Sequence, residues 1–171
     1  MTTIFGIDPG IASTGYGIIA VDGNRMRHLA HGVITTNARE QTGARLTHIF
    51  SELEALLKRY RPAEAGVEAL YFSKNITSAI PVAHARGVVL LALAQSGIEA
   101  REYTPQAIKS AIVGEGRATK QQITEFVRVL LNLPEAPTPD HASDALAAAI
   151  CHNNNRGYHA LEHAALGKAA P

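Results

Sequence analysis

The chain lacks tryptophan, has a single cysteine and carries aromatic residues at only 5% of its 171 positions. With Cys151 as the only thiol, an internal disulfide is excluded, and a reducing compartment is favoured. The N-terminus has no basic stretch followed by an apolar one, so no signal peptide is expected. The longest apolar run, residues 87–94, is too short to span a bilayer. We therefore expect a cytoplasmic protein without a membrane segment.

Neither sign of charge dominates, because 16 Lys and Arg face 15 Asp and Glu. A net charge of +1 neither supports nor excludes a nucleic-acid partner, since a nuclease combines basic residues for phosphate with acids at its active site. Hydrophobic residues make up 46% and charged residues 18%, which is typical of a globular protein. The length suits one domain with a sizeable core.

The order of apolar patterns predicts an α/β fold. Strands are expected at 3–8, 14–21 and 25–35 with tight connections, which makes an antiparallel meander. Residues 42–60 have the spacing of an amphipathic helix that crosses over to a parallel strand at 64–68. A nearly all-apolar helix at 76–96, a fifth strand at 98–103 and further helices follow. We expect one folded domain at residues 1–153, followed by a flexible C-terminal tail at residues 154–171.

Four polar side chains stand out as candidates for a metal site. Asp8 and Glu68 each end a predicted strand, and His141 and Asp144 are three apart on the last predicted helix, so they share a face. Hard cations such as Mg²⁺ use few carboxylates and keep positions open for phosphate oxygens and water. Two such cations can activate a water and stabilise a leaving oxygen in phosphodiester cleavage.

Each of these residues also has an ordinary interpretation. Asp8 precedes a Pro-Gly pair that is typical of a type II turn. Glu68 alone could be a surface residue at a strand end, and a single histidine early in a helix is usually not a ligand. Asp140 suits the first turn of a helix, although it lies near enough to Asp144 to reach the site. The glycines after Asp8 do not make a phosphate-binding P-loop, because Tyr16 stands where its lysine would be.

The segment after Glu68 favours a nucleic-acid ligand. Tyr71 and Phe72 are adjacent aromatics followed by Lys74, so a ring could stack on an unpaired base while the lysine contacts phosphate. Alternatively, the two rings close the core. A second group of candidate phosphate contacts lies around Gly114-Glu115-Gly116: Lys109, Arg117 and Lys120.

These motifs, in this order, resemble the RuvC family of Holliday-junction resolvases within the ribonuclease H-like superfamily. The resemblance covers about residues 4–152. It rests on Gly6–Gly10 with Thr14–Gly17, on Glu68–Asn75, on Ala85–Val88, on Val113–Gly116 and on Asp144–Ala147. The combination is specific, although no single motif is.

The resemblance implies a five-stranded mixed sheet flanked by helices and a homodimer that cuts opposed strands of four-way junction DNA. It also implies two Mg²⁺ or Mn²⁺ ions per site, 5′-phosphate products and a branch-migration partner of the RuvA–RuvB type. Asp8, Glu68, His141 and Asp144 take the catalytic and metal-binding positions, and Tyr71 the junction-probing one. Many members carry aspartate where this chain has His141, so Mn²⁺ is expected to be favoured.

Three alternatives stay open from the sequence. A catalytically weak junction-binding protein is favoured by the histidine in place of an acid. A related nuclease acting on ribosomal RNA precursors is opposed by the long 76–96 helix and the aromatic segment. A sugar-kinase or actin-like ATPase begins with a similar strand and turn but needs two such domains, and this chain supplies one.

Overall fold

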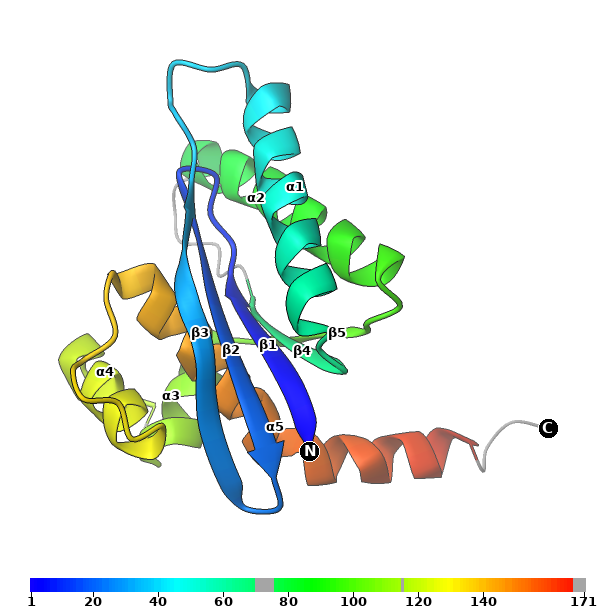
Figure 1. Cartoon of the computed structure of the whole chain (residues 1–171), viewed down its shortest axis with the longest axis vertical. Coiled ribbons are helices and arrows are strands. Elements are labelled where there is room, and N and C mark those ends of the chain that lie inside the picture. The colour runs from blue at the N-terminus through cyan, green and yellow to red at the C-terminus, as the bar shows by residue number, and fades with distance from the viewer. Residues whose placement is uncertain (70–75, 115, 168–171) are drawn as a thin grey trace.

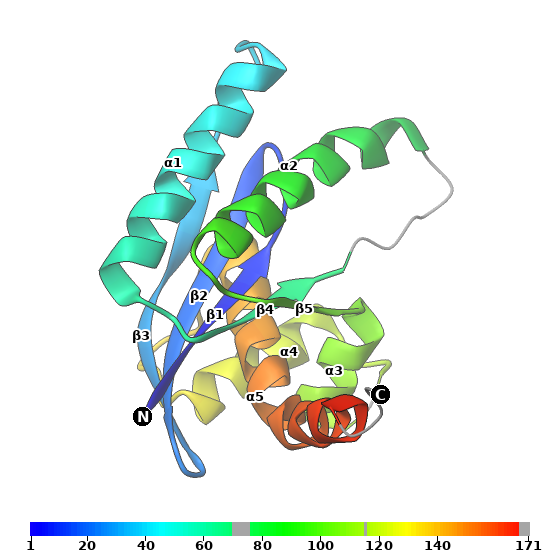
Figure 2. The ribbon, with the colours of Figure 1, turned by 90° about the vertical axis from the view of Figure 1, so that its right-hand side faces the viewer.

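A computed structural model of the chain describes residues 1–69, 76–114 and 116–167. A five-stranded sheet lies between two layers of helices (Figures 1 and 2). Its strands are β1 (Thr2–Asp8), β2 (Ser13–Asp22), β3 (Arg25–Thr35), β4 (Glu64–Glu68) and β5 (Ala100–Tyr103). The helices are α1 (Thr42–Tyr60), α2 (Ile76–Gln95), α3 (Pro105–Val113), α4 (Lys120–Leu130) and α5 (Asp140–Gly167).

The sheet has the strand order β3-β2-β1-β4-β5, with β1 to β3 antiparallel and β4 and β5 parallel to β1. This confirms the predicted fold class. Because β1 and β4 are parallel neighbours, Asp8 and Glu68 end their strands at the same edge of the sheet. No helix in the described part of the chain is long and apolar enough to cross a membrane.

Local signals in the sequence set several helix ends. The hydroxyl of Thr104 accepts a hydrogen bond from the backbone N–H of Ala107, with Pro105 in the first turn of α3. Thr119 and Gln122 form the reciprocal capping box that begins α4. These caps satisfy backbone N–H groups that a helix leaves unpaired. The cap at Thr119 also fixes the position of Lys120, because Lys120 is the first residue of α4.

The two faces of the sheet carry separate cores. One side is filled by α1 and α2, with Phe5, Ile7, Leu53, Val67 and Val89 fully buried. On the other side, α3, α4 and the first part of α5 pack against the sheet (Figure 2). The beginning of α5 is central to this second core, because all residues from Ala145 to Cys151 are buried.

Helix α5 lies unusually close to the sheet because a row of glycines faces it. Gly6 pairs with Gly17 on β2 and with Gly66 on β4, so three neighbouring strands lack a side chain at the same level. A Cβ placed at Gly6 would lie 1.9 Å from the carbonyl oxygen of Ala145, and one at Gly15 would lie 1.9 Å from that of His141. The small side chains of α5 and these glycines therefore allow direct backbone contact.

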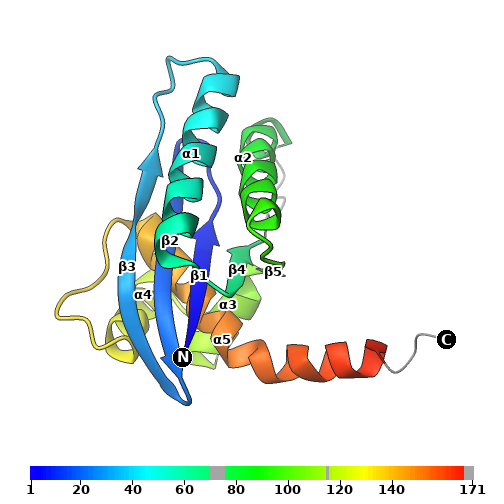
Figure 3. The ribbon, with the colours of Figure 1, turned by 45° about the vertical axis from the view of Figure 1, so that its right-hand side comes forward.

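Residues 154–167, expected from the sequence to be a flexible tail, continue α5 as a helix. The last turns extend past the edge of the sheet, away from the body of the domain (Figure 3). Helical structure in this segment does not test its motion, so its flexibility stays a prediction.

Substituting Gly6 with alanine should destabilise the protein by ~3 kcal/mol, because the new methyl group would force α5 away from β1. Urea unfolding of the variant measures the loss. Gly43 in α1 is the matched control, since a Cβ there meets nothing within 4 Å. Gly43→Ala should leave stability unchanged or raise it by up to about 1 kcal/mol. Equal stability of the two variants would contradict the close contact.

Candidate functional site

Three of the four candidate ligands converge at the carboxyl end of β1. Asp8 ends that strand, and His141 and Asp144 lie in the first turns of α5, which crosses the sheet at this point. One ligand atom from each of the three residues lies within 4.8 Å of the others. Residues 133 positions apart in the sequence meet here because Gly15, opposite Asp8 on β2, lets the backbone of His141 approach the sheet.

The three side chains already make polar contacts with one another or with a lysine. Nδ1 of His141 lies 2.6 Å from Oδ2 of Asp8. The Lys120 ammonium donates to Oδ2 of Asp144 at 2.9 Å and lies 3.3 Å from Asp140. Asp144 is a quarter exposed and Asp8 less so, whereas His141 is about half exposed. The two carboxylates are therefore mostly covered, and the site is open to solvent on the side of His141.

Glu68 borders the same site from β4. It lines a pocket of about 150 Å³ together with Asp144, Lys109 and Lys120. The pocket thus combines two acids with two lysines, and its apolar wall comes from α3 to α5. Glu68 is not among the three residues with converging ligand atoms, so it approaches the group without joining it.

The crowding of acids changes their protonation. Burial, followed by the charges of Asp8 and Asp144, raises the pKa of Glu68 to about 8. Burial also raises the pKa of Asp8, although its hydrogen bond with His141 opposes that shift. Carboxyl groups in such surroundings resist ionising unless a cation joins them. The donor set of carboxylate oxygens and one imidazole nitrogen suits a divalent cation that would replace this electrostatic strain.

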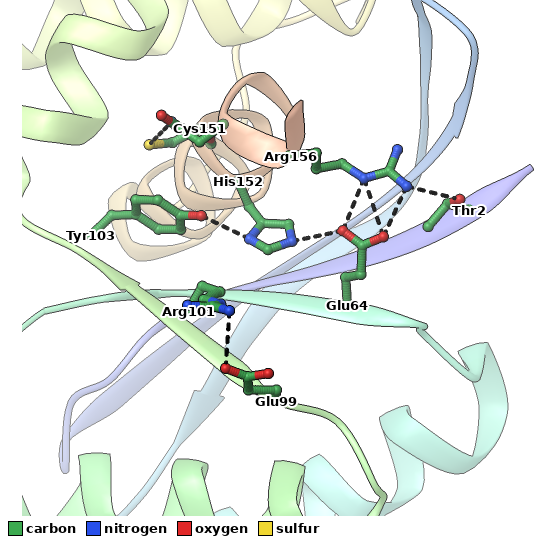
Figure 4. A network of polar contacts seen from close by, with 9 residues as sticks. Thr2, Glu64, Glu99, Arg101, Tyr103, Cys151, His152 and Arg156 are labelled. Carbon is green, nitrogen blue, oxygen red and sulfur yellow. Dashed lines mark hydrogen bonds and ion pairs between the residues drawn. The ribbon is translucent and has the colours of Figure 1, made fainter. Parts of the chain in front are cut away.

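The other end of the buried part of α5 is fixed by a polar network that the sequence did not reveal (Figure 4). His152 is buried between the Tyr103 hydroxyl at 2.9 Å and the Glu64 carboxylate at 2.8 Å. Arg156 donates to both oxygens of Glu64 at 2.8 and 2.9 Å. Burial alone would raise the pKa of Glu64, but hydrogen bonds from Arg156 and His152 hold it below its ordinary value.

This network connects α5 to β4 and β5, the two strands that run parallel to β1. Glu64 begins β4, the strand that ends in Glu68, and Tyr103 pairs with Glu68 in the sheet. Gly66 lies between the two glutamates and leaves room for the Cβ of His152. Asp144 and His152 are eight residues apart on one helix, so the network fixes the height at which Asp144 meets Glu68.

The remaining candidates fall into two groups. Arg117 is exposed and does not line the pocket that holds Lys109 and Lys120. Tyr71, Phe72 and Lys74 lie outside the described residues. The roles of the glycine row and of His152 were not predicted, because no local sequence pattern marks these residues. Glycines recurring near Asp8 and Glu68 were the available signal, but their shared level depends on strand register.

Comparison with known proteins gives a consistent result. The family model described as crossover junction endodeoxyribonuclease RuvC matches residues 4–152. The crossover junction endodeoxyribonuclease RuvC of Treponema denticola is 53% identical, covering 86% of this chain and 83% of its own. That of Heliobacterium modesticaldum is 52% identical, with 86% and 91% covered.

Solved structures show the same fold. The structure of Thermus thermophilus RuvC in complex with Holliday junction substrate is similar, with a TM-score of 0.88, 34% identity, and 93% of this chain and 97% of the other covered. The yeast mitochondrial Holliday junction resolvase Ydc2 shares the fold at 12% identity and a TM-score of 0.62, with 92% of this chain and 83% of the other covered.

Without added metal, the free energy of unfolding should fall as pH rises from 5 to 8. Folded Glu68 keeps its proton up to about pH 8, whereas the unfolded side chain loses it near its ordinary value of 4.5. The unfolded state then binds fewer protons, which gives a negative slope of up to about 1.4 kcal/mol per pH unit. Urea unfolding in EDTA should show a flatter profile for Glu68→Gln. Glu52→Gln, an exposed control on α1, should follow the wild type; parallel curves for all three proteins would refute the shift.

Proposed function

Because the chain belongs to the RuvC family of crossover junction endodeoxyribonucleases, we propose that it is the nuclease that resolves four-way (Holliday) junctions in DNA recombination and repair. The observation that carries the proposal is the convergence of Asp8, His141 and Asp144 beside Glu68, at the edge where the family's acids are expected. Four polar side chains clustered in one open site do not pack a hydrophobic core, and at this separation they are not independently solvated surface groups.

The residues present fit a divalent cation. Asp8, His141 and Asp144 offer converging donor atoms, and burial, followed by the charges of Asp8 and Asp144, raises the pKa of Glu68 beside them. We assign these four residues to the binding of two Mg²⁺ or Mn²⁺ ions. Bound metal supplies an activated water and stabilises the leaving 3′ oxygen, so that cleavage leaves 5′-phosphate and 3′-hydroxyl ends.

The chain's own residues prepare this site in two ways. His141 and Lys120 hold the carboxylates of Asp8 and Asp144 in place by direct polar contacts. Lys109 and Lys120 line the pocket beside Glu68, where their positive charge offsets charge that develops on a scissile phosphate. Lys120 can release Asp144 to metal and turn to phosphate, because half of its side chain is exposed.

DNA binding extends beyond the pocket in this proposal. Arg117 is exposed on the segment between α3 and α4 and offers a backbone phosphate contact. Tyr71, Phe72 and Lys74, which lie outside the described residues, are assigned to DNA contact because segment 68–75 resembles the family's junction-probing segment. Tyr71 stacking on an unpaired base is the expected contact.

We further propose a homodimer through α2. Ile80 and Leu91 are eleven residues apart, hence on one face of the helix, and each is about half exposed. Large apolar side chains exposed on one helix face favour a protein partner, and paired cuts need a second copy. A branch-migration complex of the RuvA–RuvB type and a location in the cytoplasm complete the proposal.

The relatives, which are named crossover junction endodeoxyribonucleases, do not favour the alternative of a catalytically weak junction-binding protein that His141 had suggested. A nuclease for ribosomal RNA precursors would show the same metal site but would prefer RNA. Cleavage of a synthetic four-way DNA junction separates these functions.

Asp8→Asn should reduce junction cleavage at least 100-fold while junction binding stays within a few-fold of wild type. The amide keeps the shape of the side chain but loses the charge that holds metal. Single-turnover cleavage and a gel-shift assay on the same synthetic junction measure the two effects. Asp22→Asn, at the far end of β2, is the matched control and should cut normally. Substantial cleavage by Asp8→Asn would remove Asp8 from the metal site.

Wild-type protein should cut faster with Mn²⁺ than with Mg²⁺ at equal concentration, because Mn²⁺ accepts an imidazole nitrogen more readily. His141→Asp should narrow this ratio by restoring an oxygen donor, and His141→Ala should lower the rate with both metals. Initial cleavage rates across a metal titration give the comparison. A ratio unchanged by His141→Asp would place the imidazole outside the coordination.

Leu91→Glu should convert the dimer into folded monomers, because the charge would lie in the apolar contact between two α2 helices. Sedimentation velocity measures the mass, and circular dichroism checks the fold. Val129→Glu, an equally exposed apolar position on α4, should keep the wild-type mass. A dimer in both variants would exclude this face of α2.

A further inference from the structure

Two histidines meet on the edge strand β3, away from the candidate nuclease site. Nε2 of His28 lies 2.8 Å from Nδ1 of His31, and the ring centroids are 4.9 Å apart. Both side chains are partly exposed. The strand β2 separates β3 from β1, so Asp8 lies about 10 Å or more from this pair.

A β-bulge brings the two rings together. In a regular strand, residues three apart point to opposite faces of the sheet. In β3 the register shifts, so that Ile18 pairs with Ala30 while its neighbour Ile19 pairs with His28, and one extra residue lies between them. The bulge therefore turns His28 to the same face as His31.

Cross-strand partners identify that face as the one that α5 covers. His31 pairs with Gly17, where a Cβ would lie 2.7 Å from the backbone nitrogen of Leu146. His28 pairs with Ile19, which is buried in the core that α3 to α5 share. His28 also lines a pocket of about 620 Å³ whose other walls include residues 131–134. The His28 ring, in contact with His31, thus borders a recess that a small ion can enter.

The environment keeps both imidazoles available as neutral ligands. Burial lowers the pKa of each ring, and for His28 the neighbouring His31 lowers it further. Within the residues that the structure describes, no carboxylate lies within ion-pair distance of either ring. Two neutral nitrogens without an acid favour Zn²⁺, Cu²⁺ or Ni²⁺ over Mg²⁺, which prefers oxygen.

The geometry points to a second metal site, in which His28 Nε2 and His31 Nδ1 bind one borderline divalent transition-metal cation and solvent completes its coordination. Zinc–nitrogen distances of about 2.0–2.1 Å in a tetrahedral arrangement separate two nitrogens by ~3.4 Å. The rings then need to part by only about half an ångström from their present contact. The proton shared between them moves to solvent when metal takes its place.

Such a site differs from the nuclease site in ligand type and in consequence. It contains no carboxylate, so Mg²⁺ should not compete for it. Metal binding would join two residues on either side of the bulge and hold the edge strand in its present register. Zn²⁺ should accordingly stabilise the folded protein even when the nuclease site is disabled.

Zinc binding to untagged, full-length protein tests the proposal. All measurements use a His159→Gln/His163→Gln background with Mg²⁺ in excess, because those two histidines are four apart in the sequence and could bind zinc themselves. Competition with a chromogenic chelator gives the number of zinc equivalents. In an Asp8→Asn version of this background, which disables the nuclease site, the protein with both histidines should bind one more zinc equivalent than its His28→Asn or His31→Asn variant.

Thermal unfolding provides a second measurement on the same samples. Zn²⁺ should raise the melting temperature of the Asp8→Asn background, and this rise should disappear when His31→Asn is added. Equal zinc uptake with and without His31→Asn would overturn the proposal. So would the absence of bound zinc in the Asp8→Asn background, since any zinc bound by the protein with Asp8 would then occupy the nuclease site.

A measurement without substitutions at the pair covers the case in which these variants do not fold. Diethyl pyrocarbonate modifies accessible neutral imidazoles, and peptide mass spectrometry locates the products. Zn²⁺ should protect His28 and His31 together, while His48 on α1 serves as an exposed reference that reacts at the same rate with and without zinc. Unchanged modification of His28 and His31 would refute the site independently.

Discussion

The structure depends on one close contact, that between the start of α5 and the glycine row of β2, β1 and β4. Any side chain at Gly6 or Gly15 would overlap a carbonyl oxygen of the helix, so the helix can lie at this depth only because those positions have no Cβ. The depth matters for chemistry as well as packing. Asp8 reaches ligand distance of His141 and Asp144 only where helix and strand backbones touch. The sheet therefore lacks side-chain packing at these glycine positions, and this absence allows the site to form.

The site itself opposes folding when no cation is present. Glu68 ionises only near pH 8, and burial also raises the pKa of Asp8, because neighbouring carboxylates and little water surround them. Two hydrogen-bond partners reduce this cost: the Lys120 ammonium at Asp144 and the His141 imidazole at Asp8. Both are about half exposed and hence able to move. Stability and metal binding are therefore linked, because the clustered carboxylates that lower the stability of the metal-free fold are the groups that attract a cation.

Most of the architecture was predictable because the strands and helices are each marked locally. The apolar runs that end at Asp8 and Glu68 and the helical spacing in 42–60 appear in the structure as expected, and local capping residues, Thr104 and Thr119, begin α3 and α4. The resemblance to a family, more than the residues alone, singled out His141. Its position opposite Asp8 requires the fold, because 132 residues separate the two in the chain.

What escaped prediction depends on register and on burial. The common level of Gly6, Gly17 and Gly66 exists only once three strands are paired. Helix 76–96 is apolar on nearly every side in the sequence, so its two distinct faces were not predictable: Val89 is fully buried in the core, whereas Leu91 is exposed. A charge at Val89 would therefore unfold the domain and could not report on a dimer.

The polar network around His152 gives α5 a second fixed point, and this has a consequence for the metal site. A rigid helix held only at Asp144 could slide or rotate on the smooth glycine surface, since glycines offer no side chains to lock into. His152 removes that freedom, because its two ring nitrogens engage Glu64 of β4 and Tyr103 of β5 at once. Glu64 is in turn held by two hydrogen bonds from Arg156, one turn further along α5. The close backbone contact sets how deep the helix lies, and the network sets its position along the strands. Only the two together place Asp144 beside Glu68, so the ligand geometry rests on groups that never touch the metal.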